Sequence, residues 1–200
     1  MKAPPKLVCL ESYWSERMFQ TFSVKGFFEA MAPLVHPPLT VAHRFVESEN
    51  GFDYYTRRGG VMWRQEELFD APVFYLAFHG APGAVKSVLG RIGAERLCDA
   101  FSGYGDNGYK NLVYFAACNV LRGQAGRRFA REFLKATGVR ALIGYSTTVD
   151  WMASLVADML FLQRFYSDPS PWRNLRRIFA SVQRDYPRAR RLGHTLVTRD

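Results

Sequence analysis

The sequence contains few cysteines and no long apolar run, and these absences limit the kind of protein it can encode. Its three cysteines, Cys9, Cys98 and Cys118, lack the close spacing with cysteine or histidine that a zinc site requires. An odd number of separated thiols, with only a brief apolar patch at 7–10 and no secretory signal, predicts reduced cysteines in a cytoplasmic protein. Charged residues interrupt the most apolar helical segment, 151–165, so we expect a core helix and no membrane partner.

The chain also lacks internal repeats, low-complexity segments and linkers rich in glycine or serine. At 200 residues it is long enough for one domain with a full core and short for two. A composition of 48% hydrophobic and 15% aromatic residues excludes a disordered or collagen-like chain. The sequence therefore predicts a single folded domain over 1–200.

Acidic residues are scarce in the second half of the chain, which carries the whole net charge of +9. Residues 1–100 hold 11 basic and 11 acidic side chains, so 16 of the 27 basic and 7 of the 18 acidic residues lie in 101–200. A basic excess is typical of nucleic-acid-binding proteins, but arginine-rich helical segments are most often solvated helix faces. We therefore expect no nucleic-acid partner. Binding of an acidic partner or an anionic signalling ligand by the arginine-rich half stays open as an alternative.

Short runs rich in β-branched, leucine and aromatic residues predict strands. They are Lys6–Leu10, Thr40–Val46, Val73–Phe78, Leu112–Ala116 and Ala141–Tyr145, with a last one at Thr195–Arg199. Between these runs, apolar residues recur at helical spacing. The predicted helices are Ser23–Met31, Gly93–Phe101, Ala125–Thr137, Trp151–Tyr166 and Trp172–Tyr186.

This alternation predicts an α/β fold with a mostly parallel central sheet of about six strands and helices on both faces. The mixed polarity of Thr40–Val46 indicates a strand near an edge of the sheet, and Thr195–Arg199 is expected to return as the other edge strand. Two further segments fit the alternation less well. Gly51–Arg64 is predicted to be a loop, and Ala84–Ile92 a small hairpin.

Two of the predicted strand ends carry reactive side chains. Binding and catalytic sites of parallel sheets form beyond the carboxyl ends of the strands. One strand runs directly into His79 and the next central strand into Cys118, so the two side chains lie together if the strands are neighbours. An imidazole within hydrogen-bond reach of a thiol can take its proton and make it a nucleophile. We therefore predict a catalytic pair, against the alternative that both are structural residues.

Gly80 is predicted to meet a second requirement of acyl transfer, which is stabilisation of the oxyanion. Because it has no side chain, its backbone N–H can approach a substrate carbonyl closely. Together with the N–H of Cys118, that of Gly80 is predicted to form an oxyanion hole for a tetrahedral intermediate.

These motifs resemble a known family. Phe78-His79-Gly80 after one hydrophobic strand and Ala116-Ala117-Cys118 after the next resemble the caspase-like cysteine peptidases, the clan of caspases, metacaspases, separase, gingipains and bacterial CHAT-type proteases. With the segments at 8–11, 144–145 and 149–151, the chain is most similar to a compact bacterial group of that fold. The resemblance covers the chain in element order. It implies a three-layer sandwich and a dyad of His79 and Cys118.

The resemblance also implies an activity and its setting. The protein would be a cysteine endopeptidase that acts through an acyl-enzyme, without cofactor or metal, latent until activated in bacterial antiviral defence or signalling. Its partners would be a protein or peptide substrate and an activating partner or anionic ligand. Asn119-Val120 follows the cysteine where caspases have Arg-Gly, so aspartate specificity is not implied. The alternative is a catalytically inactive scaffold that uses its arginine-rich half to bind an acidic partner or ligand.

The substrate pocket is expected to include Asp150 and Trp151. In the family, the segment after the strand that follows the cysteine strand lines the pocket for the residue before the scissile bond. Asp150 would then pair with a substrate Arg or Lys, with Trp151 as an apolar wall. An equally weighted alternative is that Asp150 only caps the helix that begins at Trp151.

Three residues near the first strand are also candidates. Glu11 is predicted either to orient His79 or to form an acidic wall of the pocket, against the alternative of a solvated charge at a strand end. Tyr13 and Trp14 are candidates for the groove, and aromatic packing is their alternative.

Overall fold

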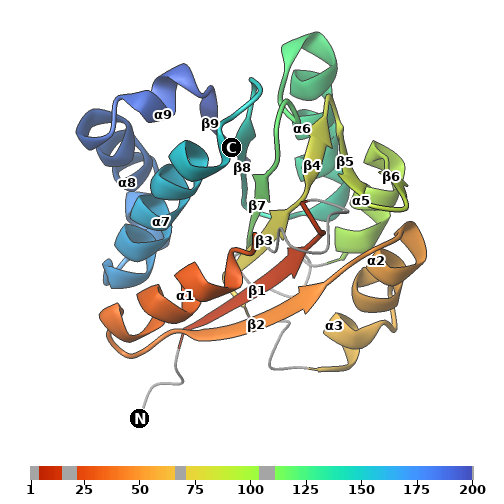
Figure 1. Cartoon of the computed structure of the whole chain (residues 1–200), viewed down its shortest axis with the longest axis horizontal. Helices are drawn as coiled ribbons and strands as arrows, with labels where there is room; N and C mark the ends of the chain where they lie inside the picture. The colour runs from red at the N-terminus through yellow and green to blue at the C-terminus, as the bar shows by residue number, and fades with distance from the viewer. Residues whose placement is uncertain (1–4, 15–21, 66–70, 104–110, 200) are drawn as a thin grey trace.

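The chain forms alternating strands and helices around a central sheet (Figure 1). The computed structural model describes residues 5–14, 22–65, 71–103 and 111–199. The strands of the main sheet are β1 (Lys6–Glu11), β2 (Thr40–Phe45), β3 (Val73–Ala77), β7 (Leu112–Ala116), β8 (Ala141–Tyr145) and β9 (His194–Thr198). A second sheet contains β4 (His79–Ala81), β5 (Ala84–Ser87) and β6 (Gly90–Ile92). The helices are α1 (Lys25–Met31), α2 (Glu49–Thr56), α3 (Val61–Arg64), α5 (Ala94–Phe101), α6 (Gly123–Thr137), α7 (Trp151–Ser167), α8 (Pro171–Asp185) and α9 (Arg188–Arg191), with a 3-10 turn at Ala32–Leu34.

The main sheet has the strand order β2-β1-β3-β7-β8-β9. Its strands run parallel except β9, which pairs antiparallel with β8. This arrangement confirms the predicted α/β fold with a mostly parallel six-stranded sheet, and it confirms the two predicted edge strands. In the middle of the sheet, β3 and β7 pair from Val73 with Leu112 to Ala77 with Ala116. Their carboxyl ends therefore meet at the same edge.

Helices cover both faces of the sheet because alternate strand residues point to opposite sides. In β3, Tyr75 points into the core formed with α1, α7 and α8, while Phe74 and Leu76 point into the core formed with α2, α5 and α6. Figure 1 shows these two groups of helices on opposite sides of the strands. A fully buried Leu or Phe side chain contributes about 1.5–3 kcal/mol relative to an exposed one. The two cores therefore hold the strand ends of the central pair in place.

Beyond β3 the chain turns directly into the second, antiparallel sheet. Only the buried Phe78 separates the end of β3 from His79, the first residue of β4. β4 and β5 are joined by a two-residue turn that ends at Gly83, whose φ of 66° suits glycine. β5 and β6 form the hairpin predicted over Ala84–Ile92, which is thereby confirmed. The second sheet thus fixes the backbone immediately after the central strand.

The prediction of a loop over Gly51–Arg64 is wrong, because this segment lies largely in α2 and α3. Ser48 caps α2 by accepting the N–H of Gly51 at 3.1 Å, and Phe52 and Thr56 are buried one turn apart. Residues such as Gly51 are weak helix formers, so the cap and the tertiary burial stabilise this short helix and local propensity does not.

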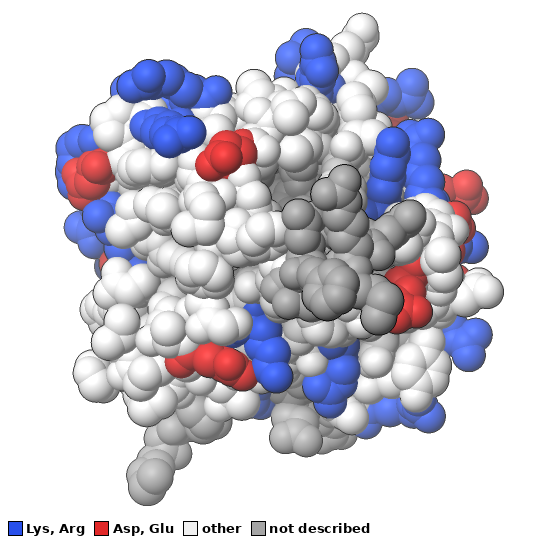
Figure 2. Space-filling model, viewed as in Figure 1, with Lys and Arg blue, Asp and Glu red and all other residues white. Residues whose placement is uncertain are grey.

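The arginine-rich helices lie on opposite faces of the main sheet. Helix α6 packs Phe129 and Phe133 into one core, and α8 packs Ile178 and Val182 into the other. Figure 2 shows basic side chains dispersed over one face of the molecule, with a group over α8 and α9. On the face shown, the basic side chains therefore do not form one continuous track. Within the described ranges, no helix combines the length and the apolar character needed to cross a membrane.

Candidate functional site

The pairing of β3 with β7 brings the two predicted catalytic residues to one groove. Ala77 and Ala116 are register partners, and each chain then leads within two residues to His79 or Cys118. Both side chains line a groove of about 530 Å³ at this edge of the sheet. The described lining residues are Tyr13, Trp14, His79, Gly80, Lys86, Ser87, Val88, Cys118, Asn119 and Thr148.

The Cys118 sulfur is held in this groove by contacts with the β8–α7 connection. The Val149 N–H donates to Sγ at 3.4 Å, and the thiol lies 3.8 Å from the Val149 carbonyl oxygen. Cys118 is partly exposed, so a ligand in the groove can reach the sulfur. A backbone N–H donor becomes a stronger partner when the sulfur carries negative charge, as it does in a nucleophilic thiolate.

The other two thiols lie in different surroundings. Burial raises the pKa of Cys9 well above its ordinary value, with a smaller effect from Glu11. Burial, followed by the charges of Asp99 and Glu132, raises the pKa of Cys98 to about 11. Since the thiolate is the reactive form, neither is suited to act as a nucleophile at neutral pH. Cys118 is the cysteine that faces the groove.

The ring of His79 is positioned by Trp14. His79 Nε2 lies 3.2 Å from the main-chain oxygen of Trp14, and the two rings meet edge to face with centroids 5.4 Å apart. A carbonyl oxygen only accepts hydrogen bonds, so Nε2 is the donor in this contact, and in a neutral ring the lone pair is then on Nδ1. Among the described residues Nδ1 has no hydrogen-bond partner, which leaves it able to accept a proton.

Gly80 approaches the backbone of Cys118 so closely that no side chain fits between them. A β-carbon built on Gly80 would lie 1.9 Å from the Cys118 carbonyl oxygen and 2.8 Å from its nitrogen. In the β4–β5 ladder the closing pair is Ala81 with Ala84, so the next pair, Gly80 with Val85, is the kind that exchanges no hydrogen bonds. The Gly80 N–H therefore points away from β5.

The Cys118 N–H also has no acceptor within the part of the chain that the structure describes. The N–H groups of Gly80 and Cys118 thus belong to two adjoining backbone segments that line the groove, and neither has a ladder or helix partner among the described residues. Such a pair matches the donors that stabilise a developing oxyanion.

The backbone after Cys118 is fixed by a strained residue and by two loops. Asn119 has a φ of 60°, and its N–H donates to the Thr147 carbonyl at 2.9 Å. The Thr147 hydroxyl in turn donates to the Leu192 carbonyl at 2.7 Å, and the Ser146 N–H donates to that of Gly193 at 3.0 Å. The turn between α9 and β9 therefore supports the loop that holds the cysteine.

Asp150 and Trp151 do not belong to the described lining of the groove. The carboxylate of Asp150 accepts the N–H of Ala153 at 2.8 Å, which makes it the N-cap of α7. Trp151 packs against the rings of Phe22 and Phe27, with centroids 5.5 and 5.7 Å away. The structure thus shows the capping role that was the alternative for Asp150, and it gives both residues a local structural role.

Glu11 is fully buried, so the interpretation as a solvated strand-end charge is wrong. Its carboxylate accepts hydrogen bonds from four donors, among them the indole N–H of Trp14 at 2.8 Å. The described groove residues do not include Glu11. Glu11 is therefore connected to His79 through Trp14, which contacts both residues. It does not form an acidic wall of the groove.

Sequence reasoning missed several lining residues, of which Lys86 is the most informative. It lies opposite His79 in the β4–β5 ladder, on the same face of that hairpin. It is the one Lys, Arg, Asp or Glu among the described lining residues. The predicted hairpin over Ala84–Ile92 did not contain this information, because it pairs β5 with β6 and leaves out β4, the strand that begins at His79. Tyr13 and Trp14, for which a groove role was open, do line the groove.

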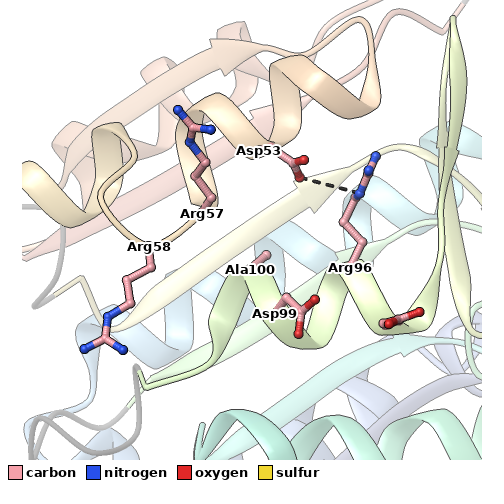
Figure 3. Close-up of a pocket in the computed structure, with 7 residues that line it drawn as sticks. Asp53, Arg57, Arg58, Arg96, Asp99 and Ala100 are labelled. Carbon is pink, nitrogen blue, oxygen red and sulfur yellow. Dashed lines mark ion pairs between the residues drawn. The ribbon is translucent and has the colours of Figure 1, made fainter.

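Two other hollows lack the features of this site. One, of about 560 Å³ between α2 and α5, contains Arg57, Arg58 and Arg96, but Asp53, Glu95 and Asp99 offset them, and Arg96 is paired with Asp53 at 3.7 Å (Figure 3). The other, of about 530 Å³ between α1 and α7, is lined by apolar side chains and Gln163. Neither combines a nucleophile with a base.

No group of three or more His, Cys, Asp or Glu side chains in the described residues could hold a metal ion. No protein-family model matches the chain, and no curated protein matches it. The site is therefore interpreted from its own geometry.

Proposed function

We propose that the protein is a caspase-like cysteine endopeptidase in which Cys118 is the nucleophile and His79 the general base. The observation that carries the proposal is one groove that holds the Cys118 thiol, a histidine with Nδ1 available, and the two backbone N–H groups of Gly80 and Cys118. Each of these parts answers a separate need of acyl transfer, and they come from two neighbouring strand ends.

In the proposed reaction His79 Nδ1 takes the thiol proton, and the Cys118 sulfur forms a bond to the carbonyl carbon of the scissile peptide. The carbonyl oxygen becomes an oxyanion that accepts from the Gly80 and Cys118 N–H groups. Collapse breaks the C–N bond, and His79 returns the proton to the leaving amine. Water, deprotonated by His79, then hydrolyses the thioester and restores the thiol.

The described groove residues do not favour the substrate preference that the sequence suggested. A preference for Arg or Lys before the scissile bond depended on Asp150, whose carboxylate caps α7 outside the described lining. The groove itself presents Lys86. We therefore propose that acidic side chains are accepted more readily than basic ones near the scissile bond.

The test is covalent labelling with a peptidyl acyloxymethyl ketone, followed by intact-mass measurement. We expect one adduct on the wild-type protein, none on Cys118→Ala, and strongly slowed labelling of His79→Ala. Cys98→Ala is the matched control, because it removes a thiol of raised pKa and should label like wild type. If wild type takes up no more label than Cys118→Ala with any activating condition, the peptidase proposal fails and the inactive scaffold is favoured.

A further inference from the structure

We propose that Glu11 is a positioning residue for catalysis, acting through Trp14 to fix the ring of His79. This inference rests on the proposed peptidase function. In this proposal a buried carboxylate outside the groove keeps the general base in one orientation.

Glu11 ends β1, and both of its carboxylate oxygens are occupied. Oε1 accepts from the Trp14 indole N–H at 2.8 Å and from the Val24 backbone N–H at 2.9 Å. Oε2 accepts from the Ser23 hydroxyl and from His43 Nε2, each at 2.7 Å. The side chain is fully buried, so these bonds replace the water that a carboxylate would otherwise require.

This set of donors is specific for a carboxylate. Four donors converge on two oxygens, and a buried anion that accepts several hydrogen bonds forms stronger bonds than a neutral amide. A glutamine would keep one acceptor oxygen and turn an N–H₂ group toward donors. The position therefore favours a side chain with two acceptor oxygens over an amide of the same size.

The effect of Glu11 reaches the groove through one residue. Trp14 is bonded to Glu11 by its side chain, while its main-chain oxygen accepts from His79 Nε2 at 3.2 Å. Its indole ring also lies at 78° to the imidazole ring. Because only two residues separate Glu11 from Trp14, the indole bond fixes the carbonyl that His79 meets.

Fixing that carbonyl selects the useful tautomer. With the proton on Nε2, the lone pair of His79 is on Nδ1, where it can accept the proton of Cys118. When Trp14 is free to move, the ring of His79 is able to take the other tautomer or rotate. A change in the base position of about 1 Å can reduce turnover by about 100-fold.

The first experiment compares Glu11→Gln, Trp14→Phe and their combination by labelling rate and by peptide hydrolysis. We expect Glu11→Gln to lower the labelling rate and kcat by about 10- to 100-fold, with KM changed by less than about 3-fold. Trp14→Phe removes the indole donor and keeps the main-chain oxygen, so it should produce a similar loss of kcat. The double variant should be no slower than the slower single variant, because both remove the same bond.

Ser23→Ala is the matched control. It removes one donor from Oε2 and leaves the Oε1 bond to Trp14 in place, so its kcat should stay within about 2-fold of wild type. Equal losses in Ser23→Ala and Glu11→Gln, or multiplicative losses in the double variant, would overturn the positioning role. If Glu11→Gln does not fold, Trp14→Phe alone supplies the comparison.

A second measurement separates this inference from the peptidase proposal. The ring ¹⁵N chemical shifts of His79 report its tautomer whether or not the protein cleaves anything. We expect the Nε2-protonated form in wild type and a mixture in Glu11→Gln or Trp14→Phe. Unchanged ring signals in the variants overturn the positioning role, whereas absent labelling of wild type overturns the peptidase proposal.

Discussion

The α-carbon of Gly80 lies against the peptide of Cys118, so that a β-carbon at position 80 would be 1.9 Å from the Cys118 carbonyl oxygen. Real β-carbons do not approach backbone atoms this closely. The contact therefore links the hairpin that follows β3 to the residue that follows β7. It also explains why this position requires glycine although its neighbours in β4 do not.

Gly80→Ala should separate the two backbone segments and move the proposed oxyanion donors. We expect labelling of Cys118 to slow by about 100-fold or more, as on loss of an oxyanion-hole donor, and the free energy of unfolding to fall by about 1–3 kcal/mol. Denaturant unfolding and intact-mass labelling measure the two effects. Gly26→Ala is the control: position 26 is in α1, and a β-carbon there would meet no described atom outside its own helix within 4 Å, so stability should rise by about 0.5–1 kcal/mol. A Gly80→Ala protein that labels like Gly26→Ala would contradict this account.

Lys86 is expected to set the charge preference of the groove. In wild type, peptides with Glu or Asp beside the scissile bond should be cleaved faster than those with Arg or Lys. Because Lys86 is exposed, the ratio should change by only about 3- to 5-fold in Lys86→Met, reverse in Lys86→Glu, and shrink with added salt. Competition between paired peptides in one reaction measures the ratio. An unchanged ratio across the three proteins would remove Lys86 as a determinant.

Asp150 is expected to matter for stability and not for substrate choice. Asp150→Ala removes the bond to the Ala153 N–H and should lower the free energy of unfolding by about 1 kcal/mol. Asp150→Asn keeps a capping oxygen and removes the charge, so its stability should stay near wild type. Neither change should alter the relative cleavage of basic and acidic peptides. Loss of cleavage at basic residues in Asp150→Asn would instead support the pocket role that the sequence left open.

Asp158 is expected to make stability depend on pH. Its fully buried carboxylate accepts from the hydroxyls of Tyr75, Tyr114 and Tyr145, and burial raises its pKa from 3.8 to about 6 despite these bonds. Between pH 4 and 6, therefore, the folded protein keeps a proton that the unfolded chain has released. The stabilisation is fully present below about pH 4 and is lost as the pH rises through about 6.

Asp158→Asn isolates this effect. The free energy of unfolding of wild type minus that of Asp158→Asn should increase as the pH falls from 6 to 4, by at most about 1.4 kcal/mol per pH unit. Burial lowers the pKa of His194 to about 3, which destabilises both proteins in acid and largely cancels in the difference. Urea denaturation at four pH values measures it. A difference that stays flat over this range would show that Asp158 does not titrate as described.

The architecture could be predicted from the sequence because its strands are apolar and clearly bounded. Central strands such as Val73–Ala77 are buried on both faces, which leaves a continuous apolar run that is easily seen. Helix α2 could not be predicted in the same way. It contains a glycine and buries only Phe52 and Thr56, so its stability depends on a cap and on contacts that the local sequence does not display.

The site could be predicted only in part. A shared location for His79 and Cys118 was predicted on the condition that their two strands are neighbours, and the pairing of β3 with β7 meets that condition. The surroundings of Glu11 did not follow, since its partners include Ser23 and His43, which are distant in the sequence and reach it only after the sheet has formed. A carboxylate at a strand end is ordinarily hydrated, and nothing local marks this one as buried.

The hydrogen bonds between Thr147 and Leu192 and between Ser146 and Gly193 connect the loop that contacts Cys118 to the turn between α9 and β9. Val149, on the same loop, donates to the sulfur. A displacement of the α9–β9 turn would therefore reach the Cys118 sulfur through Thr147 and Val149, and would also press on Gly80, which lies against the Cys118 peptide. The position of the Cys118 sulfur relative to His79 therefore depends in part on a turn that is not among the described residues lining the groove.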